Sequence, residues 1–228
     1  MNRVVFLLLF LPSMLLSQTN FEKGVQLLGS GKTELARIAF ESVIKENPSH
    51  TKSLEYLGDI AGQNKNWDKA ILYYKKIKII QPNNADYQYK YGGALGMKAK
   101  TVNKFKALGM IDEIKSSFEK AAALDPKHTE SRWALVMLYL ELPGIIGGSE
   151  TKATAYSNEL MRLSPLDGYL SKGYIDEYFG RNKKAELNYS KALELTNSKV
   201  AFQKLYNLYL NRMKNSDKAQ QLKEQFEK

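Results

Sequence analysis

The chain has 228 residues, with 34 Lys and Arg, 24 Asp and Glu and no cysteine, which gives a formal net charge of +10. This length suffices for one folded domain or one repeat array, and 14 Tyr and 9 Phe argue against disorder over most of the chain. The lack of cysteine excludes disulfides, thiol nucleophiles and cysteine metal sites, and lysines interleaved with acids indicate solubility rather than nucleic-acid binding.

The first 17 residues have the order of a secretory signal peptide. A basic start, Met1 to Arg3, precedes an apolar run from Val4 to Leu16 and then small polar residues. The run is shorter than the roughly 20 residues that a spanning helix needs, and it has no cysteine for lipid attachment. We therefore predict a signal peptide over residues 1–17 and an exported, periplasmic protein. An uncleaved membrane anchor is the alternative.

Proline and small residues recur along the remainder of the chain. Amphipathic segments end at Pro48 and at Pro82, which are 34 residues apart, and again near Pro126 and Pro165. The residue before a proline disfavours the helical conformation, so each proline indicates the end of a helix pair. Small residues 12 apart are expected where the two helices of a pair cross: Gly24 and Ala36, Gly58 and Ala70, Gly173 and Ala185. Aromatic residues are expected to fill the space between successive pairs: Phe40, Tyr74, Phe118 and Tyr189.

The segment from Thr51 to Asn84 resembles a tetratricopeptide repeat. Its matching residues are Leu54, Leu57, Gly58, Ala61, Ala70, Tyr74, Ile77 and Pro82, with Trp67 as the aromatic residue of the turn. The resemblance implies an all-α fold, a right-handed α-solenoid of about six antiparallel helix pairs, in a single domain over residues 18–228. The implied repeats are 18–50, 51–84, 85–128, 129–167, 168–199 and 200–228.

Two repeats are longer than the family's period. The repeat at 85–128 has an insertion, Lys100 to Gly109, between its two helices. The first helix is expected over 85–99, and residues 114–124 form the last part of the second. The stretch over 98–109 carries a basic edge of four lysines with no acid: Lys98, Lys100, Lys104 and Lys106. This edge could meet an anionic membrane surface or an acidic partner. In the alternative, it is a solvated loop with Phe105 and Leu108 anchored inward.

The repeat at 129–167 has its insertion over residues 142–149. Ser149 is expected to cap a helix that begins near Glu150. Adjacent glycines before a helix can bind an anion, but Glu150 would oppose one, so a structural turn is favoured. The segment Pro143 to Ser149 resembles a loop of bacterial helical-repeat proteins, including the T component of tripartite solute transporters. That resemblance implies an exported solute-binding protein as partner.

In this family the first helix of each pair lines a concave groove. By position, the groove residues of the middle repeats are Tyr89, Gly93, Gly96, Trp133, Met137, Tyr174 and Glu177. We expect the two glycines to leave a hollow beside an aromatic and methionine wall, which suits an apolar side chain. Alternatively, the glycines only permit close helix packing and Phe105 or Leu108 covers the hollow. The family's carboxylate clamp uses Lys, Arg and Asn, whereas this chain has Glu55 and Asp59, so clamp-type recognition is not predicted.

These features predict an extracytoplasmic protein-interaction scaffold that binds a partner protein of the cell envelope, or an apolar peptide segment, in its groove. The alternative is a ligand-carrying accessory protein of a solute transport system, which would hold a small apolar ligand. Catalysis is not predicted. His50 and His128 occupy equivalent turns and do not converge, and no metal-ligand spacing, nucleophile motif or nucleotide loop occurs. No cofactor, metal or nucleic acid is expected.

Overall fold

The structure is a computed structural model that describes residues 19–227. These residues form helices and connecting loops without a β-strand, and they divide into two compact units that meet in sequence between Leu124 and Asp125. No helix among them has the length and apolarity needed to cross a membrane. The predicted signal peptide, residues 1–17, lies outside the described residues.

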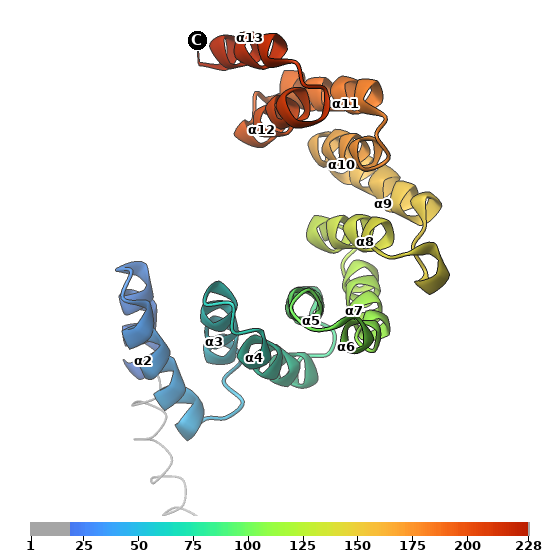
Figure 1. The fold of residues 1–228 in the computed structure, drawn as a ribbon. Coiled ribbons are helices and arrows are strands. Elements are labelled where there is room, and N and C mark those ends of the chain that lie inside the picture. The colour runs from blue at the N-terminus through green and yellow to red at the C-terminus, as the bar shows by residue number, and fades with distance from the viewer. Residues whose placement is uncertain (1–18, 228) are drawn as a thin grey trace, which may run out of the picture. The chain divides into compact units, whose positions relative to one another are not determined.

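The first unit contains three of the predicted helix pairs (Figure 1). Residues 19–29 are helical and pack against the next helix. The labelled elements are α2 (Thr33–Glu46), α3 (Thr51–Gln63), α4 (Trp67–Ile80), α5 (Ala85–Ala99), α6 (Lys104–Leu108) and α7 (Ile111–Leu124). The pairs are therefore 19–29 with α2, α3 with α4, and α5 with α7. The short helix α6 lies in the predicted insertion.

The second unit contains the other three pairs. Its elements are α8 (Thr129–Glu141), the 3-10 turn η1 (Gly144–Ile146), α9 (Glu150–Leu163), α10 (Pro165–Tyr178), α11 (Asn182–Thr196), α12 (Lys199–Asn207), the π-helical turn η2 (Leu208–Arg212) and α13 (Ser216–Phe226). The pairs are α8 with α9, α10 with α11, and α12 with α13. Pro165 is the first residue of α10, where its missing N–H costs nothing. The predicted all-α fold of six helix pairs is confirmed for the described residues.

Most helices begin at a side chain that accepts a backbone hydrogen bond. Asn66 and Asn84 cap α4 and α5, and Ser149 caps α9 as predicted, with its Oγ accepting from the Lys152 N–H. His50 and His128 do the same for α3 and α8, where each Nδ1 accepts from the N–H three residues later, at 3.2 and 3.0 Å. The two histidines thus start equivalent helices, which gives them a structural role.

Glycines on first helices allow the aromatic rings to approach closely. Phe40 lies against Gly24, Tyr74 against Gly58 and Tyr189 against Gly173, so that a Cβ on any of these glycines would overlap the ring. As predicted, aromatic residues also pack against the next pair: Phe40 lies in one core cluster with Leu57 and Ile60 of α3, and Tyr189 in another with residues of α12. Each ring packs on the glycine of its own pair, because only a residue without a side chain leaves room for it.

Candidate functional site

In the second unit, the predicted groove residues lie on the first helices of two successive pairs. Trp133 and Met137 are one turn apart on α8, and Tyr174 and Glu177 are one turn apart on α10. The rings of Trp133 and Tyr174 meet edge to face, with centroids 6.5 Å apart. Both rings are half-buried, and the Met137 side chain is 38% exposed. We call Trp133, Met137 and Tyr174 the aromatic face.

Polar contacts fix the two rings of the aromatic face. The indole N–H of Trp133 donates to Asp167 at 2.8 Å, which ties α8 to the start of α10. The ammonium of Lys204, on α12, lies 5.1 Å from the centroid of the Tyr174 ring. Asp167 and Lys204 were not among the predicted site residues. A signal was available for Asp167, which follows Trp133 by 34 residues, the repeat period.

The carboxylate of Glu177 lies beside the aromatic face, one turn from Tyr174 on α10. It accepts from the Tyr189 hydroxyl at 2.9 Å and faces Arg212 at 3.4 Å. Burial of Tyr174, together with the nearby carboxylates of Glu141 and Glu177, raises the pKa of its phenol, which keeps the ring neutral. The face therefore combines apolar contact area with a border that carries both signs of charge, from Glu177 and from Arg212 and Lys204.

In the first unit, the predicted groove residues Tyr89, Gly93 and Gly96 share one face of α5. The Tyr89 ring packs against Phe118 of α7, with centroids 5.8 Å apart. At Gly93 no atom lies within 4 Å of the place that a Cβ would take, and at Gly96 the nearest is Ile114 Cγ2 at 4.0 Å. The expected bare stretch of backbone is present on this helix.

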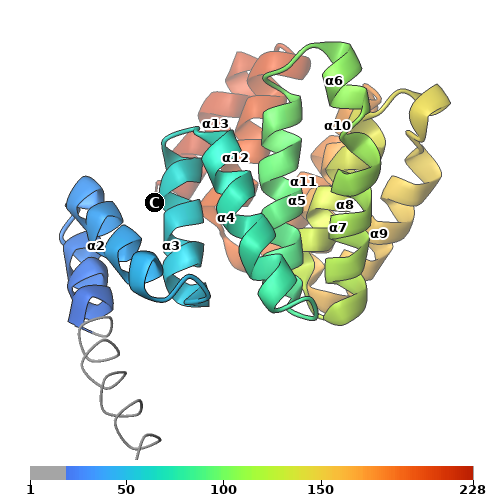
Figure 2. The same ribbon diagram turned by 90° about the horizontal axis from the view of Figure 1, so that it is seen from below.

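The alternative explanation of these glycines is wrong. Close packing occurs instead at Gly92, where a Cβ would lie 3.0 Å from both Phe118 and Ser117. The place of a Cβ at Gly93 is empty, and neither Phe105, which is 88% exposed, nor Leu108, which is 44% exposed, is buried. The insertion forms its own capped helix at the end of the α5–α7 pair, as Figure 2 shows, and does not fold back along α5.

The seven predicted groove residues are thus divided between the two units. Tyr89, Gly93 and Gly96 belong to the first unit and Trp133, Met137, Tyr174 and Glu177 to the second. Within the second unit, the two aromatic residues do come together. That all seven line one groove stays a prediction.

The lysines of the basic edge differ in exposure. Lys98 is partly buried and forms an ion pair with Asp68 of α4 at 2.6 Å, and Lys100, Lys104 and Lys106 are exposed. The expectation that Phe105 and Leu108 are anchored inward is wrong, because no residue of α6 is buried. The insertion instead presents its apolar and its basic side chains to solvent together.

Glu55 and Asp59 occupy first-helix positions of α3, and both are engaged by α5. The ammonium of Lys90 lies 2.8 Å from Glu55 and 2.8 Å from Asp59, and the Tyr74 hydroxyl donates to Asp59 at 2.6 Å. Burial opposes ionisation of Glu55, but hydrogen bonds from Lys90 and Lys52 outweigh it and lower the pKa of its carboxyl. These two acids therefore join successive pairs.

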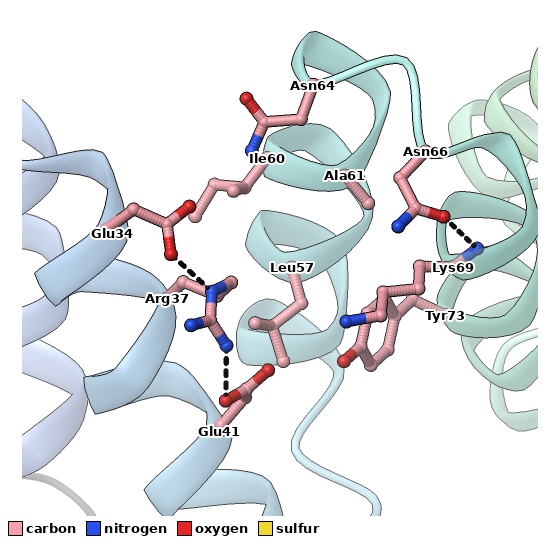
Figure 3. Close-up of a pocket in the computed structure, with 10 residues that line it drawn as sticks. All are labelled: Glu34, Arg37, Glu41, Leu57, Ile60, Ala61, Asn64, Asn66, Lys69 and Tyr73. Atoms are coloured by element: carbon pink, nitrogen blue, oxygen red, sulfur yellow. Dashed lines mark hydrogen bonds and ion pairs between the residues drawn. The ribbon is translucent and has the colours of Figure 1, made fainter.

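A cleft of about 290 Å³ lies among α2, α3 and α4 (Figure 3). Arg37 lies at its wall and pairs with Glu34 at 2.8 Å and with Glu41 at 2.7 Å. Leu57 and Ile60 form its apolar wall, and Tyr73 lies opposite Arg37. The cleft contains none of the predicted site residues, and we assign no ligand to it. Over residues 19–227, His, Asp and Glu nowhere gather into a group that could hold a metal ion.

The tetratricopeptide repeat family matches the chain over residues 21–85, which include the segment with the strongest motif. Residues 21–85 therefore carry tetratricopeptide repeats. No curated protein matches it.

Solved structures of tetratricopeptide-repeat (TPR) proteins have the same fold as most of this chain. The thermophilic TPR protein TTC0263 of Thermus thermophilus is 19% identical, with 85% of this chain and 99% of that chain covered at a TM-score of 0.67. PilW, described as a widely conserved type IV pilus biogenesis factor, is 16% identical, with 92% and 91% covered at 0.69. At these identities the likeness shows the fold, and the predicted α-solenoid class is confirmed.

Two further neighbours are described by what they bind or catalyse. YrrB, described as a TPR protein with an unusual peptide-binding site, is 16% identical. The match covers 80% of this chain and 87% of YrrB at a TM-score of 0.57. An O-GlcNAc transferase of Thermobaculum terrenum is matched over 26% of its own length. TPR scaffolds generally serve protein–protein interaction and lack catalysis of their own, so an interaction scaffold is the function class that this fold supports.

Proposed function

We propose that this protein is an extracytoplasmic scaffold whose aromatic face binds a partner protein or an apolar peptide segment of the cell envelope. The observation that carries the proposal is the half-buried pair of Trp133 and Tyr174, with Met137 exposed beside it. All three residues lie on first helices, the helices that this repeat family uses for its groove. Aromatic residues and methionine are the side chains that recur at binding surfaces.

The chemistry of the face favours an apolar segment. The rings and the thioether provide contact area, and the rings are already ordered by Asp167 and by Lys204, so little side-chain entropy remains to be lost on binding. Around the rings, Glu177 is paired with Arg212, and Lys204 lies over Tyr174, so charges of both signs border the face. A partner segment with Leu or Phe flanked by polar residues would match this arrangement.

The location in the cell envelope is part of the proposal and rests on sequence. The basic start and the apolar run up to Leu16 support export. The chain has no cysteine, so its fold does not depend on disulfides. Fractionation of cells that express the full chain tests it. Recovery in the periplasmic fraction supports the proposal, and recovery in the cytosol contradicts it.

A matched pair of substitutions tests the face. Met137→Lys places a charge on the aromatic face, and Leu195→Lys, on the second helix α11, adds the same charge at a side chain that is 52% exposed. The full chain is used to capture partners from a cell-envelope extract, and the affinity of a recovered stoichiometric partner is then measured for each variant. We expect Met137→Lys to weaken binding at least tenfold, about 1.4 kcal/mol, and Leu195→Lys to leave it unchanged.

Two results would contradict the proposal. Equal affinities of both variants for the partner would place the binding site elsewhere. A small apolar molecule that co-purifies with the chain in native mass spectrometry, with no protein partner, would favour the alternative of a ligand-carrying protein.

A further inference from the structure

The short helix α6 carries a large aromatic side chain that has no packing role. Phe105 is 88% exposed and Leu108 is 44% exposed, and no residue of α6 is buried. The helix is nevertheless defined, because the Asn103 side chain accepts from the Lys106 N–H at 3.0 Å and caps it. Phe105 is therefore exposed to water on α6, and this helix lies at the end of the α5–α7 pair (Figure 2).

Positive charge surrounds this apolar tip. Lys100, Lys104 and Lys106 are exposed, and the sequence has no acid between Asp86 and Asp112. Over residues 19–227, neither Lys104 nor Lys106 takes part in an ion pair. Lys98, which precedes the insertion, is paired with Asp68. An exposed Phe and Leu within a group of lysines match a partner that is both anionic and apolar.

We propose that the insertion from Lys100 to Gly109 docks on an anionic lipid bilayer, with Phe105 and Leu108 in the interface and the lysines at the headgroups. A bilayer presents negative charge and apolar phase in adjacent layers, which matches a tip with apolar side chains among lysines. An acidic protein would supply the charge, but a stable protein interface takes about 20–30 residues a side and the insertion has ten.

This inference does not depend on the proposed function. It concerns α6 in the first unit, whereas the aromatic face lies on α8 and α10 in the second. Docking through α6 would hold the scaffold at a membrane surface whether or not the aromatic face binds a protein. The two proposals can therefore fail separately.

Tryptophan fluorescence of a Phe105→Trp variant tests the docking at the residue itself. The full chain is titrated with vesicles of phosphatidylcholine that contain phosphatidylglycerol, and with vesicles of phosphatidylcholine alone. The emission of Trp67 and Trp133 is measured in the wild type and subtracted. We expect a blue shift of the added tryptophan with the anionic vesicles, reduced by high salt and absent with phosphatidylcholine. No shift with anionic vesicles would overturn the proposal.

Charge reversal with a matched control separates vesicle binding by the insertion from attraction of the whole basic protein to anionic vesicles. Each lysine near an anionic surface contributes roughly fivefold to partitioning, so Lys104→Glu with Lys106→Glu is expected to weaken vesicle binding at least tenfold. Lys75→Glu with Lys76→Glu makes the same charge change at exposed positions of α4 and should weaken it far less. The apolar run at residues 4–16 is common to all variants and cancels in the comparison.

Three outcomes of the vesicle experiment are decisive. A large loss confined to the insertion variant supports docking through α6. Equal losses in both double variants would show that net charge alone drives binding and would overturn the proposal. Retention on polyglutamate-coated beads through Lys104 and Lys106, without preference for anionic vesicles, would show that the insertion recognises an acidic protein and would also overturn it.

Discussion

Gly58 lies against the ring of Tyr74, and Gly173 lies against the ring of Tyr189. In each case the ring is nearly or fully buried, and its hydroxyl donates to an acid on the same first helix, Asp59 or Glu177. Neither the ring nor the backbone at the crossing can move away without breaking that hydrogen bond. Gly93 differs, because the space beside it is open.

Substitution by alanine should separate these two kinds of glycine. Gly58→Ala adds a methyl group that overlaps the Tyr74 ring and is expected to lower the free energy of unfolding by about 2 kcal/mol. Gly93→Ala meets no atom and is expected to raise it by up to about 1 kcal/mol, because alanine is the better helix former. Urea denaturation of both variants measures the difference. A loss at Gly93 comparable to that at Gly58 would show that its open space is filled in solution.

At the scale of single elements, capping side chains determine where helices start. His50 is partly buried, its ring lies 4.9 Å from that of Phe21, and its Nδ1 holds the Ser53 N–H of α3. Burial lowers the pKa of His50 below its ordinary value. A protonated His50 would also lose the lone pair that caps the helix.

This cap should make stability depend on pH in the mildly acidic range. Because the pKa of His50 is lower in the folded protein than in the unfolded chain, its contribution is complete above the ordinary histidine pKa of about 6.5 and is lost as the pH falls below it. His50→Asn keeps an acceptor for the Ser53 N–H but does not titrate. Between pH 7 and pH 5, roughly, we expect the wild type to lose up to about 1 kcal/mol more than His50→Asn in denaturant unfolding. His128 is present in both proteins and cancels, and parallel pH profiles would refute the effect.

At the scale of the whole molecule, polar contacts about one repeat apart join successive helix pairs. Lys90 reaches Glu55, 35 residues earlier, and Lys218 reaches Glu186, 32 residues earlier. In a repeat protein, stability is a sum of terms within repeats and between neighbours. Contacts of this kind belong to the second group and keep neighbouring pairs in register within each unit.

Removal of Lys90 should cost more than removal of another paired lysine on the same helix. Lys90→Met removes the cation that Glu55 and Asp59 share and leaves these two carboxylates, 17% and 35% exposed, close together, with only Lys52 still paired to Glu55. We expect a loss of about 2 kcal/mol. Lys98→Met should cost less than about 0.5 kcal/mol, because its partner Asp68 is 74% exposed. Thermal and urea unfolding measure both, and similar losses in the two variants would contradict a special role for Lys90.

The contribution of this contact to stability depends on pH, and the pKa of Glu55 gives its direction. The folded-state pKa of Glu55 is lowered, so the stabilisation is complete above the ordinary glutamate pKa of about 4.3 and is lost as the pH falls through the lower folded-state value. In Lys90→Met the Glu55 carboxyl no longer has the ion pair with Lys90, so its folded-state pKa is lowered less. The stability of that variant should therefore fall less steeply in acid than that of the wild type.

Much of the fold could be predicted because its signals are local. Pro48 and Pro82, Gly58 with Ala70, and the capping position of Ser149 each depend on neighbours within one pair, and the helices appear where these residues indicate. The site could be predicted only in part. Trp133 and Tyr174 do meet, but the direction of Phe105 was predicted wrongly, because the orientation of a five-residue helix depends on its cap and on the helices that flank it.

The sequence by itself determined the helix pairs, their order and the two insertions, since period, proline and glycine act over one repeat. Only the tertiary structure decided which glycine packs a ring and which stays open, because Gly92 and Gly93 are adjacent in sequence and point to different sides of α5. It also decided that Lys90 joins Glu55 and Asp59, and that Phe105 stands in solvent among lysines. These features depend on contacts between elements, which no single repeat contains.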